Sequence, residues 1–139
     1  MAMPADLLTA VVTILSILLV FFTGIRVGQM RTKHGIKAPA TSGNPEFDCA
    51  YRVQMNTLEQ FVMFLPLLWL ASAYFRMVGW LPAALGLVWI IGRVLYMQGY
   101  MAAPEKRGPG FGIASLATLA LLILAVIGIV MDWNAITAV

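Results

Sequence analysis

Four long apolar segments fill most of this chain of 139 residues, of which 61% are hydrophobic and 11% charged. The runs Leu7 to Ile25 and Phe111 to Met131 are each long enough to cross a bilayer, which takes about 20 helical residues. The runs Phe61 to Phe75 and Val78 to Gly92 reach that length only if neighbouring polar residues join the helices. Because lipid offers no hydrogen bonds to an exposed backbone, helices are the expected spanning structure.

The sequence therefore predicts an all-α integral membrane protein with a four-helix bundle in a single domain, 1–139. We expect helices over about 6–30, 47–75, 78–102 and 110–132. Only Asp6 is charged before the first apolar run, so this run does not resemble a cleaved signal and is expected to remain as an anchor. Gly and Pro between residues 33 and 48 predict an irregular loop there.

The distribution of basic residues predicts the orientation of the chain. Eight of the nine Lys and Arg residues lie at or between the first and second helices or the third and fourth, and only Arg76 lies in the turn between the second and third. By the positive-inside rule, the two basic connections are cytoplasmic and both termini lie outside. The positive net charge of +3 is thus a property of topology, and we expect no nucleic-acid partner.

The single cysteine and the single histidine indicate little catalytic chemistry of their own. Cys49 cannot form an intrachain disulfide, and no metal-ligand motif is present, so we expect no metal. Cys49 follows an acidic residue, which does not activate a thiol. His34 lies in a basic stretch, and we interpret it as a solvated loop residue.

A polar stripe enters the second apolar helix. Arg52, Asn56 and Glu59 are separated by offsets of four and seven, which bring their side chains within roughly 40° of one direction on a helix. A second stripe, Arg93, Tyr96 and Tyr100, occurs in the third helix. Charged groups at membrane depth are costly and usually mark a site.

The hairpin of the second and third helices brings the two stripes to one depth. If the turn lies near residues 76 to 77, Glu59 and Arg93 are each ~25 Å from it at ~1.5 Å per residue. By the same count Arg52 is level with Tyr100. The stripes could therefore line a pocket near the cytoplasmic rim.

Two explanations of these residues remain open. Glu59 and Arg93 could form an ion pair that fixes the hairpin, as in a small non-enzymatic membrane protein or a transporter. However, the polar residues outnumber what one ion pair requires, and arginines outnumber Glu59 three to one (Arg52, Arg93 and Arg107). This excess positive charge favours an anionic ligand, because arginine recognises carboxylates with two hydrogen bonds.

Two sequence motifs resemble a known family. The stretch PEFDCAYRVQMNTLEQFVMFLPLLWLAS, with its core Arg52-x-Gln54-x-Asn56-x-x-Glu59, is similar to the signature of the membrane-associated proteins in eicosanoid and glutathione metabolism (MAPEG). The stretch GRVLYMQGY, followed by a basic loop with Arg107, resembles the third-helix motif of the leukotriene C4 synthase and microsomal glutathione transferase branch. The chain length and four-helix layout agree with this resemblance.

The resemblance implies a homotrimer with glutathione bound between neighbouring subunits near the cytoplasmic face. By position, it implies these glutathione-contacting residues: Arg31, Arg52, Gln54, Asn56, Glu59, Arg93, Tyr96, Tyr100 and Arg107. It also implies that Arg107, or else Arg31 from the neighbouring subunit, activates the glutathione thiol. Gln60 departs from the tyrosine that follows the glutamate in that branch.

The implied activity is a membrane-bound glutathione transferase of the bacterial inner membrane, with glutathione peroxidase activity as an extension. Glutathione would be the co-substrate, and a hydrophobic electrophile would arrive from the bilayer. A relative that binds glutathione without conjugating it is a third alternative. The electrophile itself is not identified by the residues, because interchangeable apolar side chains would line its path.

Overall fold

Four long α-helices form the computed structural model, which describes residues 4–138. Helix α1 spans Ala5–His34, α2 spans Pro45–Tyr74, α3 spans Leu81–Ala102 and α4 spans Gly108–Thr137, while the short 3-10 helix η1, Pro104–Arg107, joins α3 to α4. Each of the four long helices is long and apolar enough to cross a membrane. No strand occurs within residues 4–138. The predicted all-α, four-helix architecture is therefore confirmed.

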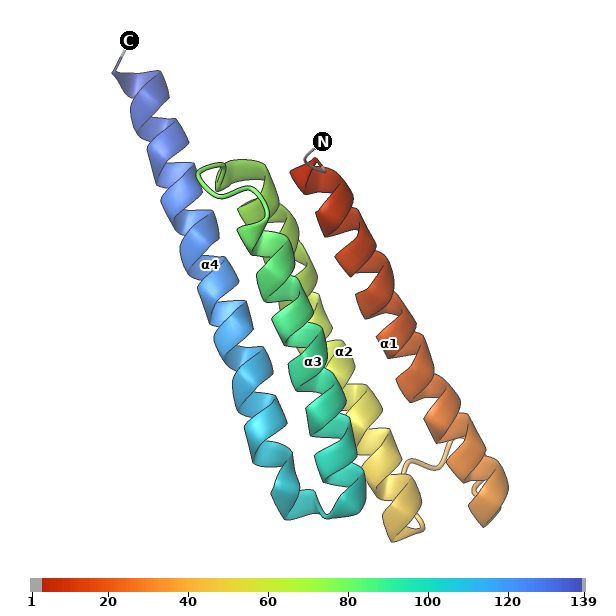
Figure 1. Ribbon diagram of the computed structural model, residues 1–139. Helices are drawn as coiled ribbons and strands as arrows, with labels where there is room; N and C mark the ends of the chain where they lie inside the picture. Colours follow the sequence, from red (N-terminus) through yellow and green to blue (C-terminus); the bar gives the residue numbers. More distant parts are fainter. Residues whose placement is uncertain (1–3, 139) are drawn as a thin grey trace.

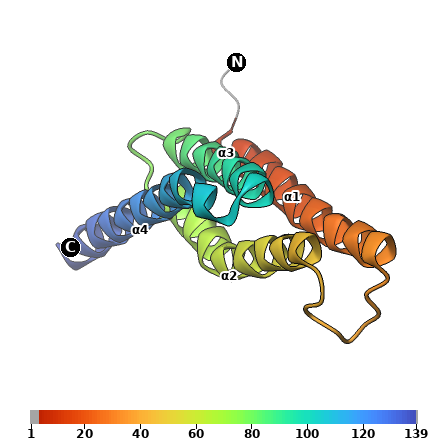
Figure 2. The ribbon, with the colours of Figure 1, turned by 90° about the horizontal axis from the view of Figure 1, so that it is seen from below.

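The helices run up and down, so that the chain connections alternate between the two ends of the bundle (Figure 1). The start of α1, the α2–α3 turn and the end of α4 lie at one end, and the α1–α2 loop and η1 lie at the other. Seen along the bundle, α2 and α3 lie between α1 and α4 (Figure 2), and each of the two outer helices contacts both inner ones. The basic connections therefore share one end of the molecule.

Local sequence signals explain where α1 ends and where α2 begins. α1 stops at Gly35, which adopts the left-handed conformation (φ 65°) and donates its N–H to the Arg31 carbonyl. α2 begins at Pro45, and the Asn44 side chain accepts a hydrogen bond from the Glu46 N–H at 2.9 Å.

The observed helices differ from the predicted bounds by a few residues. α1 and α4 continue four and five residues beyond the predicted ends, to His34 and Thr137, whereas α3 begins three residues later, at Leu81. α1 passes through Gly28 and ends only at Gly35, which adopts the left-handed conformation of a helix end.

Close helix contacts in the core depend on small residues and stacked rings. Phe64 of α2 and Trp89 of α3 are fully buried, with ring centroids 4.0 Å apart and nearly parallel planes. A side-chain carbon at Gly92 would lie 2.6 Å from the Ala114 backbone nitrogen. α3 and α4 can therefore approach closely only because Gly92 has no side chain.

The outer surface of the bundle is apolar along the middle of the four long helices. Large side chains such as Phe21 and Leu116 are more than half exposed. In water this exposure would be unfavourable, by about 25 cal/mol for each Å² of apolar surface, whereas lipid or a neighbouring subunit accommodates it. At the end of the bundle where α1 starts and α4 ends, Arg76 and Asp132 form an ion pair at 2.8 Å.

Candidate functional site

The two predicted polar stripes line one cleft at the end of the bundle that carries the basic connections. We call it the polar cleft. Its volume is about 210 Å³, and its lining comes from α2, α3 and η1: Arg52, Met55, Asn56, Glu59, Tyr96, Tyr100 and Arg107. The prediction that the stripes converge near the rim of the bundle is confirmed for five of their six residues, all except Arg93, and Arg107 of η1 joins them.

The α2 side of the polar cleft follows from helix periodicity. Arg52, Asn56 and Glu59 share one face of α2, and Arg52 and Glu59 are exposed. The Asn56 side-chain nitrogen donates to a Glu59 carboxylate oxygen at 3.4 Å. The Asn56 side-chain oxygen is buried and has no hydrogen-bond partner among residues 4–138. A buried acceptor without a partner is costly, which marks this oxygen as a polar atom that the described residues do not satisfy.

The opposite side of the cleft consists of two tyrosines and an arginine. The rings of Tyr96 and Tyr100 meet edge to face, with centroids 5.6 Å apart. The guanidinium carbon of Arg107 lies 5.5 Å from the Tyr100 ring centroid, and its Nη1 donates to the Pro104 carbonyl at 3.1 Å. η1 therefore brings a positive charge to the rim of the cleft.

Arg93 lies beneath the cleft rather than on its surface. It is only 1% exposed, and its guanidinium carbon lies 4.0 Å from the Tyr96 ring centroid. Its Nη2 donates to the Thr57 hydroxyl at 2.8 Å, whereas Nε and Nη1 have no partner among the described residues. The guanidinium is thus stabilised by the Tyr96 ring and one hydroxyl, and among the described residues no carboxylate pairs with it within 4.0 Å.

The ion pair that the alternative explanation requires is not formed. Within residues 4–138, the ion pairs closer than 4.0 Å do not include Glu59 with Arg93. Arg93 uses the buried Thr57 hydroxyl instead. Sequence reasoning missed Thr57, because a threonine beside Asn56 faces the helix interface and does not belong to the polar stripe.

The polar cleft has an excess of positive charge. Arg52 and Arg107 line it and Arg93 lies beneath it, against the single carboxylate of Glu59, so three positive charges minus one negative charge leave +2. Such an arrangement attracts an anion. The planar guanidinium groups suit carboxylates in particular.

Gln54 does not join the polar cleft. It lines a separate, mostly apolar groove of about 450 Å³ between α1 and α2. Gln54 is two residues from both Arg52 and Asn56, an offset of about 200° on a helix, which turns it to the other side of α2. A side-chain carbon at Gly24 would lie 3.1 Å from the Gln54 Nε2, so the amide is close to the α1 backbone.

Arg31 also lies away from the polar cleft, at the end of α1. Its Nη1 donates to the Ala40 carbonyl at 2.7 Å, and its guanidinium carbon lies 4.8 Å from the Phe47 ring centroid. Thus two of the nine implied glutathione contacts, Gln54 and Arg31, are on the α1 side of α2, and the other seven are in or beneath the cleft.

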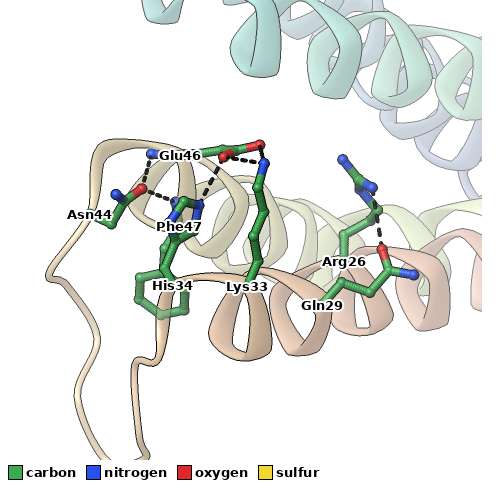
Figure 3. A network of polar contacts seen from close by, with 7 residues as sticks. All are labelled: Arg26, Gln29, Lys33, His34, Asn44, Glu46 and Phe47. Carbon is green, nitrogen blue, oxygen red and sulfur yellow. Dashed lines mark hydrogen bonds and ion pairs between the residues drawn. The ribbon is translucent and has the colours of Figure 1, made fainter.

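A polar network ties the end of α1 to the start of α2 (Figure 3). Lys33 Nζ and His34 Nε2 each lie 2.8 Å from the same oxygen of Glu46. The interpretation of His34 as a solvated loop residue is wrong: α1 continues through it, and its side chain is only 20% exposed.

A separate apolar groove lies between α2 and α4. It has a volume of about 540 Å³, and one of its lining residues is Gln60, which follows Glu59 in the sequence. Its other lining residues are mostly hydrophobic: Val62, Met63, Pro66, Leu67, Ser115, Thr118, Leu119 and Leu122. Such a groove suits the apolar body of a ligand.

The sequence model described as the MAPEG family matches residues 9–127. This chain belongs to the MAPEG family. As a MAPEG protein with four apolar helices of spanning length, it is an integral membrane protein. No group of three His, Cys, Asp or Glu residues that could hold a metal occurs in the part of the chain that the structure describes.

Individual relatives agree with this family. The chain is 42% identical over 119 residues to human microsomal glutathione S-transferase 2, an alignment that covers 86% of this chain and 79% of the relative. It is 36% identical over 122 residues to guinea pig (Cavia porcellus) leukotriene C4 synthase, covering 88% and 80%. It is also 46% identical over 123 residues to an uncharacterized protein of the cyanobacterium Synechocystis, covering 88% and 85%.

Proposed function

We propose that this MAPEG protein is a membrane-bound glutathione transferase that joins the thiolate of glutathione to hydrophobic electrophiles. The observation that carries this proposal is the polar cleft, where arginines exceed carboxylates beside an apolar groove. Similarity to microsomal glutathione S-transferase 2 supports the same activity class.

The groups of glutathione match those of the cleft. The tripeptide has two carboxylates, an ammonium group, backbone amides and a thiol. Arg52 would bind a carboxylate, and the charge of Arg93 beneath Tyr96 would favour the anion from below. Glu59 would accept from the ammonium, and the side-chain amide of Asn56, which lines the cleft, would bond to a peptide group of glutathione.

Arg107 would supply the activation of the thiol. A thiol like that of free cysteine has a pKa near ~8.5, so only a few per cent is thiolate at neutral pH. A guanidinium at the rim of the cleft favours the ionised form. Lowering the pKa by ~1 unit corresponds to about 1.4 kcal/mol, which one partly desolvated charge interaction can provide. Arg31 of a neighbouring subunit is the less favoured candidate for this role.

The hydrophobic co-substrate would approach through the membrane. The groove between α2 and α4 is open along the apolar surface, and its lining includes Gln60, which follows Glu59 in the sequence. An electrophile dissolved in the bilayer could lie in it with its reactive carbon near the thiolate. The thiolate sulfur would then form the new bond while the leaving group departs with its electron pair. The same thiolate could attack the terminal peroxide oxygen of a lipid hydroperoxide, which releases the lipid alcohol and leaves glutathione sulfenic acid; a second glutathione would then convert this to glutathione disulfide and water.

A homotrimer would complete the site. The polar cleft of one subunit, at about 210 Å³, is smaller than the ~300–1,000 Å³ typical of ligand pockets. Gln54 and Arg31 lie on the other side of α2 from the cleft. In a closed cyclic oligomer the α1 side of one subunit can meet the cleft side of the next, which unites the two sets of residues.

The polar cleft would face the cytoplasm of a bacterial inner membrane. It shares one end of the bundle with the α1–α2 loop and η1, which carry basic residues, and that end is opposite the termini (Figure 1). The positive-inside rule assigns the basic end to the cytoplasm and both termini to the outside.

Calorimetry followed by a turnover assay tests the function. The purified protein in lipid nanodiscs should bind glutathione with saturable heat and should conjugate it to an aryl halide. Saturable binding without turnover would support a glutathione-binding protein that does no conjugation. No binding would contradict the proposal and favour the structural or transporter alternative.

A further inference from the structure

η1 lies directly against the last turns of α3 at Gly99. A side-chain carbon at Gly99 would overlap the carbonyl oxygen of Lys106 and would lie 3.0 Å from its carbonyl carbon. It would also lie 3.6 Å from the backbone nitrogen of Arg107. These neighbours are backbone atoms, so they cannot be relieved by rotating a side chain. Gly99 therefore leaves the space in which η1 lies.

Two backbone hydrogen bonds hold η1 to the end of α3. Ala103 donates its N–H to the Gly99 carbonyl at 2.9 Å, and Lys106 donates to the Ala103 carbonyl at the same distance. The side chain of Arg107 then bonds back to the Pro104 carbonyl. Hydrogen bonds thus connect the end of α3 at Gly99, through η1, to the side chain of Arg107.

This contact sets the position of Arg107 relative to the cleft. Arg107 is exposed and has no ion-pair partner within 4.0 Å among the described residues, so no salt bridge fixes its side chain. Its neighbours are the Tyr100 ring, at 5.5 Å, and the Pro104 carbonyl. The fit of η1 against Gly99 is therefore the main constraint on where the guanidinium lies. A displacement of the η1 backbone would therefore move the guanidinium of Arg107.

We propose that Gly99 is a positioning residue for Arg107. Its missing side chain lets η1 lie against α3 and so holds the guanidinium over Tyr100 at the rim of the polar cleft. This inference rests on the proposed function, in which Arg107 favours the thiolate. Gly99 itself touches no substrate in this account. Substitution of Gly99 should therefore change the ionisation of the glutathione thiol but leave the contacts of Arg52, Asn56 and Glu59 intact.

The test compares Gly99→Ala with a matched glycine variant, Gly112→Ala. Gly112 is also helical, but a side-chain carbon there would meet no atom within 4 Å. For Gly99→Ala we expect the ultraviolet thiolate absorbance of bound glutathione at neutral pH to fall by about threefold or more, while its dissociation constant changes by less than about threefold. The pH at which half of the bound thiol ionises should rise. Gly112→Ala should match the wild type in both measurements.

A double-mutant cycle separates positioning from a general structural effect. If Gly99 acts through Arg107, adding Gly99→Ala to Arg107→Ala should lower the thiolate absorbance no further. An additional loss in the double variant, or unchanged absorbance in Gly99→Ala, would overturn the proposal. If the wild type binds no glutathione, the proposed function fails, and this outcome differs from wild-type binding with an unaffected Gly99→Ala.

A second variant covers the case in which Gly99→Ala does not fold. Pro104→Gly loosens the exposed start of η1 and keeps the carbonyl that Arg107 contacts. It should shift the thiolate absorbance in the same direction, by a smaller factor of about twofold, with the glutathione dissociation constant nearly unchanged. Unchanged absorbance in that variant would overturn the proposal.

Discussion

The guanidinium carbon of Arg93 lies 4.0 Å from the ring centroid of Tyr96, and the arginine is almost completely buried behind that ring. The charge is therefore brought close to the polar cleft without being open to it. Its position depends on one hydrogen bond, from Nη2 to the Thr57 hydroxyl. Arg93, which the family resemblance implied as a glutathione contact, therefore forms part of the floor of the cleft.

Thr57→Val should lower the stability of the protein by about 1–3 kcal/mol, because a buried charged donor loses its partner while the side chain keeps its shape. Thr57→Ser, which retains the hydroxyl, should lie closer to the wild type. Thermal unfolding in detergent measures both. Thr23→Val is the control, since Thr23 is equally buried but its hydroxyl bonds to its own helix. Equal losses in the Thr57 and Thr23 valine variants would contradict this role of the hydroxyl.

Arg107→Ala should slow conjugation about tenfold near neutral pH and move the pH–rate profile to higher pH. The cause is that without the guanidinium less of the bound thiol is ionised, and ~1 pKa unit is a factor of about ten in thiolate. At a pH well above the thiol pKa, the difference from the wild type should shrink. Steady-state turnover across pH checks this, and a loss that is equal at every pH would remove Arg107 from this role.

Glu59→Gln should weaken glutathione binding about tenfold, because a charge-assisted hydrogen bond to the ammonium is replaced by a neutral one. Glu105→Gln is the charge-matched control, since Glu105 lies in η1 but does not line the polar cleft. Calorimetry on the two variants compares them directly. Similar dissociation constants would indicate that only the net charge of this end of the bundle matters.

Mixed oligomers test whether the two sides of α2 belong to one shared site. Gln54→Ala and Arg52→Ala should each impair binding alone. When the two variants are co-expressed, a subunit that retains Gln54 can meet one that retains Arg52, which restores about a quarter of the sites in a random mixture. Co-purified mixed oligomers with no more binding than either parent would contradict a site between subunits.

Helix periodicity was sufficient to predict the main lining of the polar cleft. Arg52, Asn56 and Glu59 repeat at one turn and two turns of a helix, and the short α2–α3 turn brings them level with Tyr96 and Tyr100. The same periodicity also contained the reason for the separation of Gln54, whose two-residue offset turns it away. The resemblance to a family had grouped it with the others.

The burial of Arg93 could not be predicted in this way. Which side of α3 faces α4 is decided by close packing, where Gly92 allows the Ala114 backbone to approach, and this fixes how far α3 is rotated. The contact between Gly99 and the Lys106 carbonyl is likewise a tertiary contact, between α3 and η1. The sequence shows a glycine there but contains no periodic signal for the path of η1.

The position of His34 shows a different limit. Gly, Pro and polar residues correctly indicated a loop before α2, but its length depends on which glycine ends α1, and the helix passes Gly28 and stops at Gly35. Because α1 continues to His34, that side chain reaches Glu46 and joins the network of Figure 3. A misplacement by one helical turn was enough to change the interpretation of the residue.

The most direct test of the central claim is the ultraviolet difference spectrum of glutathione titrated with the purified protein near neutral pH, for the wild type and for Arg52→Ala. The account predicts a saturable thiolate absorbance for the wild type and a curve for Arg52→Ala that needs about tenfold more glutathione to saturate. If the wild type gives no thiolate signal at saturating glutathione, or if Arg52→Ala gives the same curve, the polar cleft is not the site at which this protein activates glutathione.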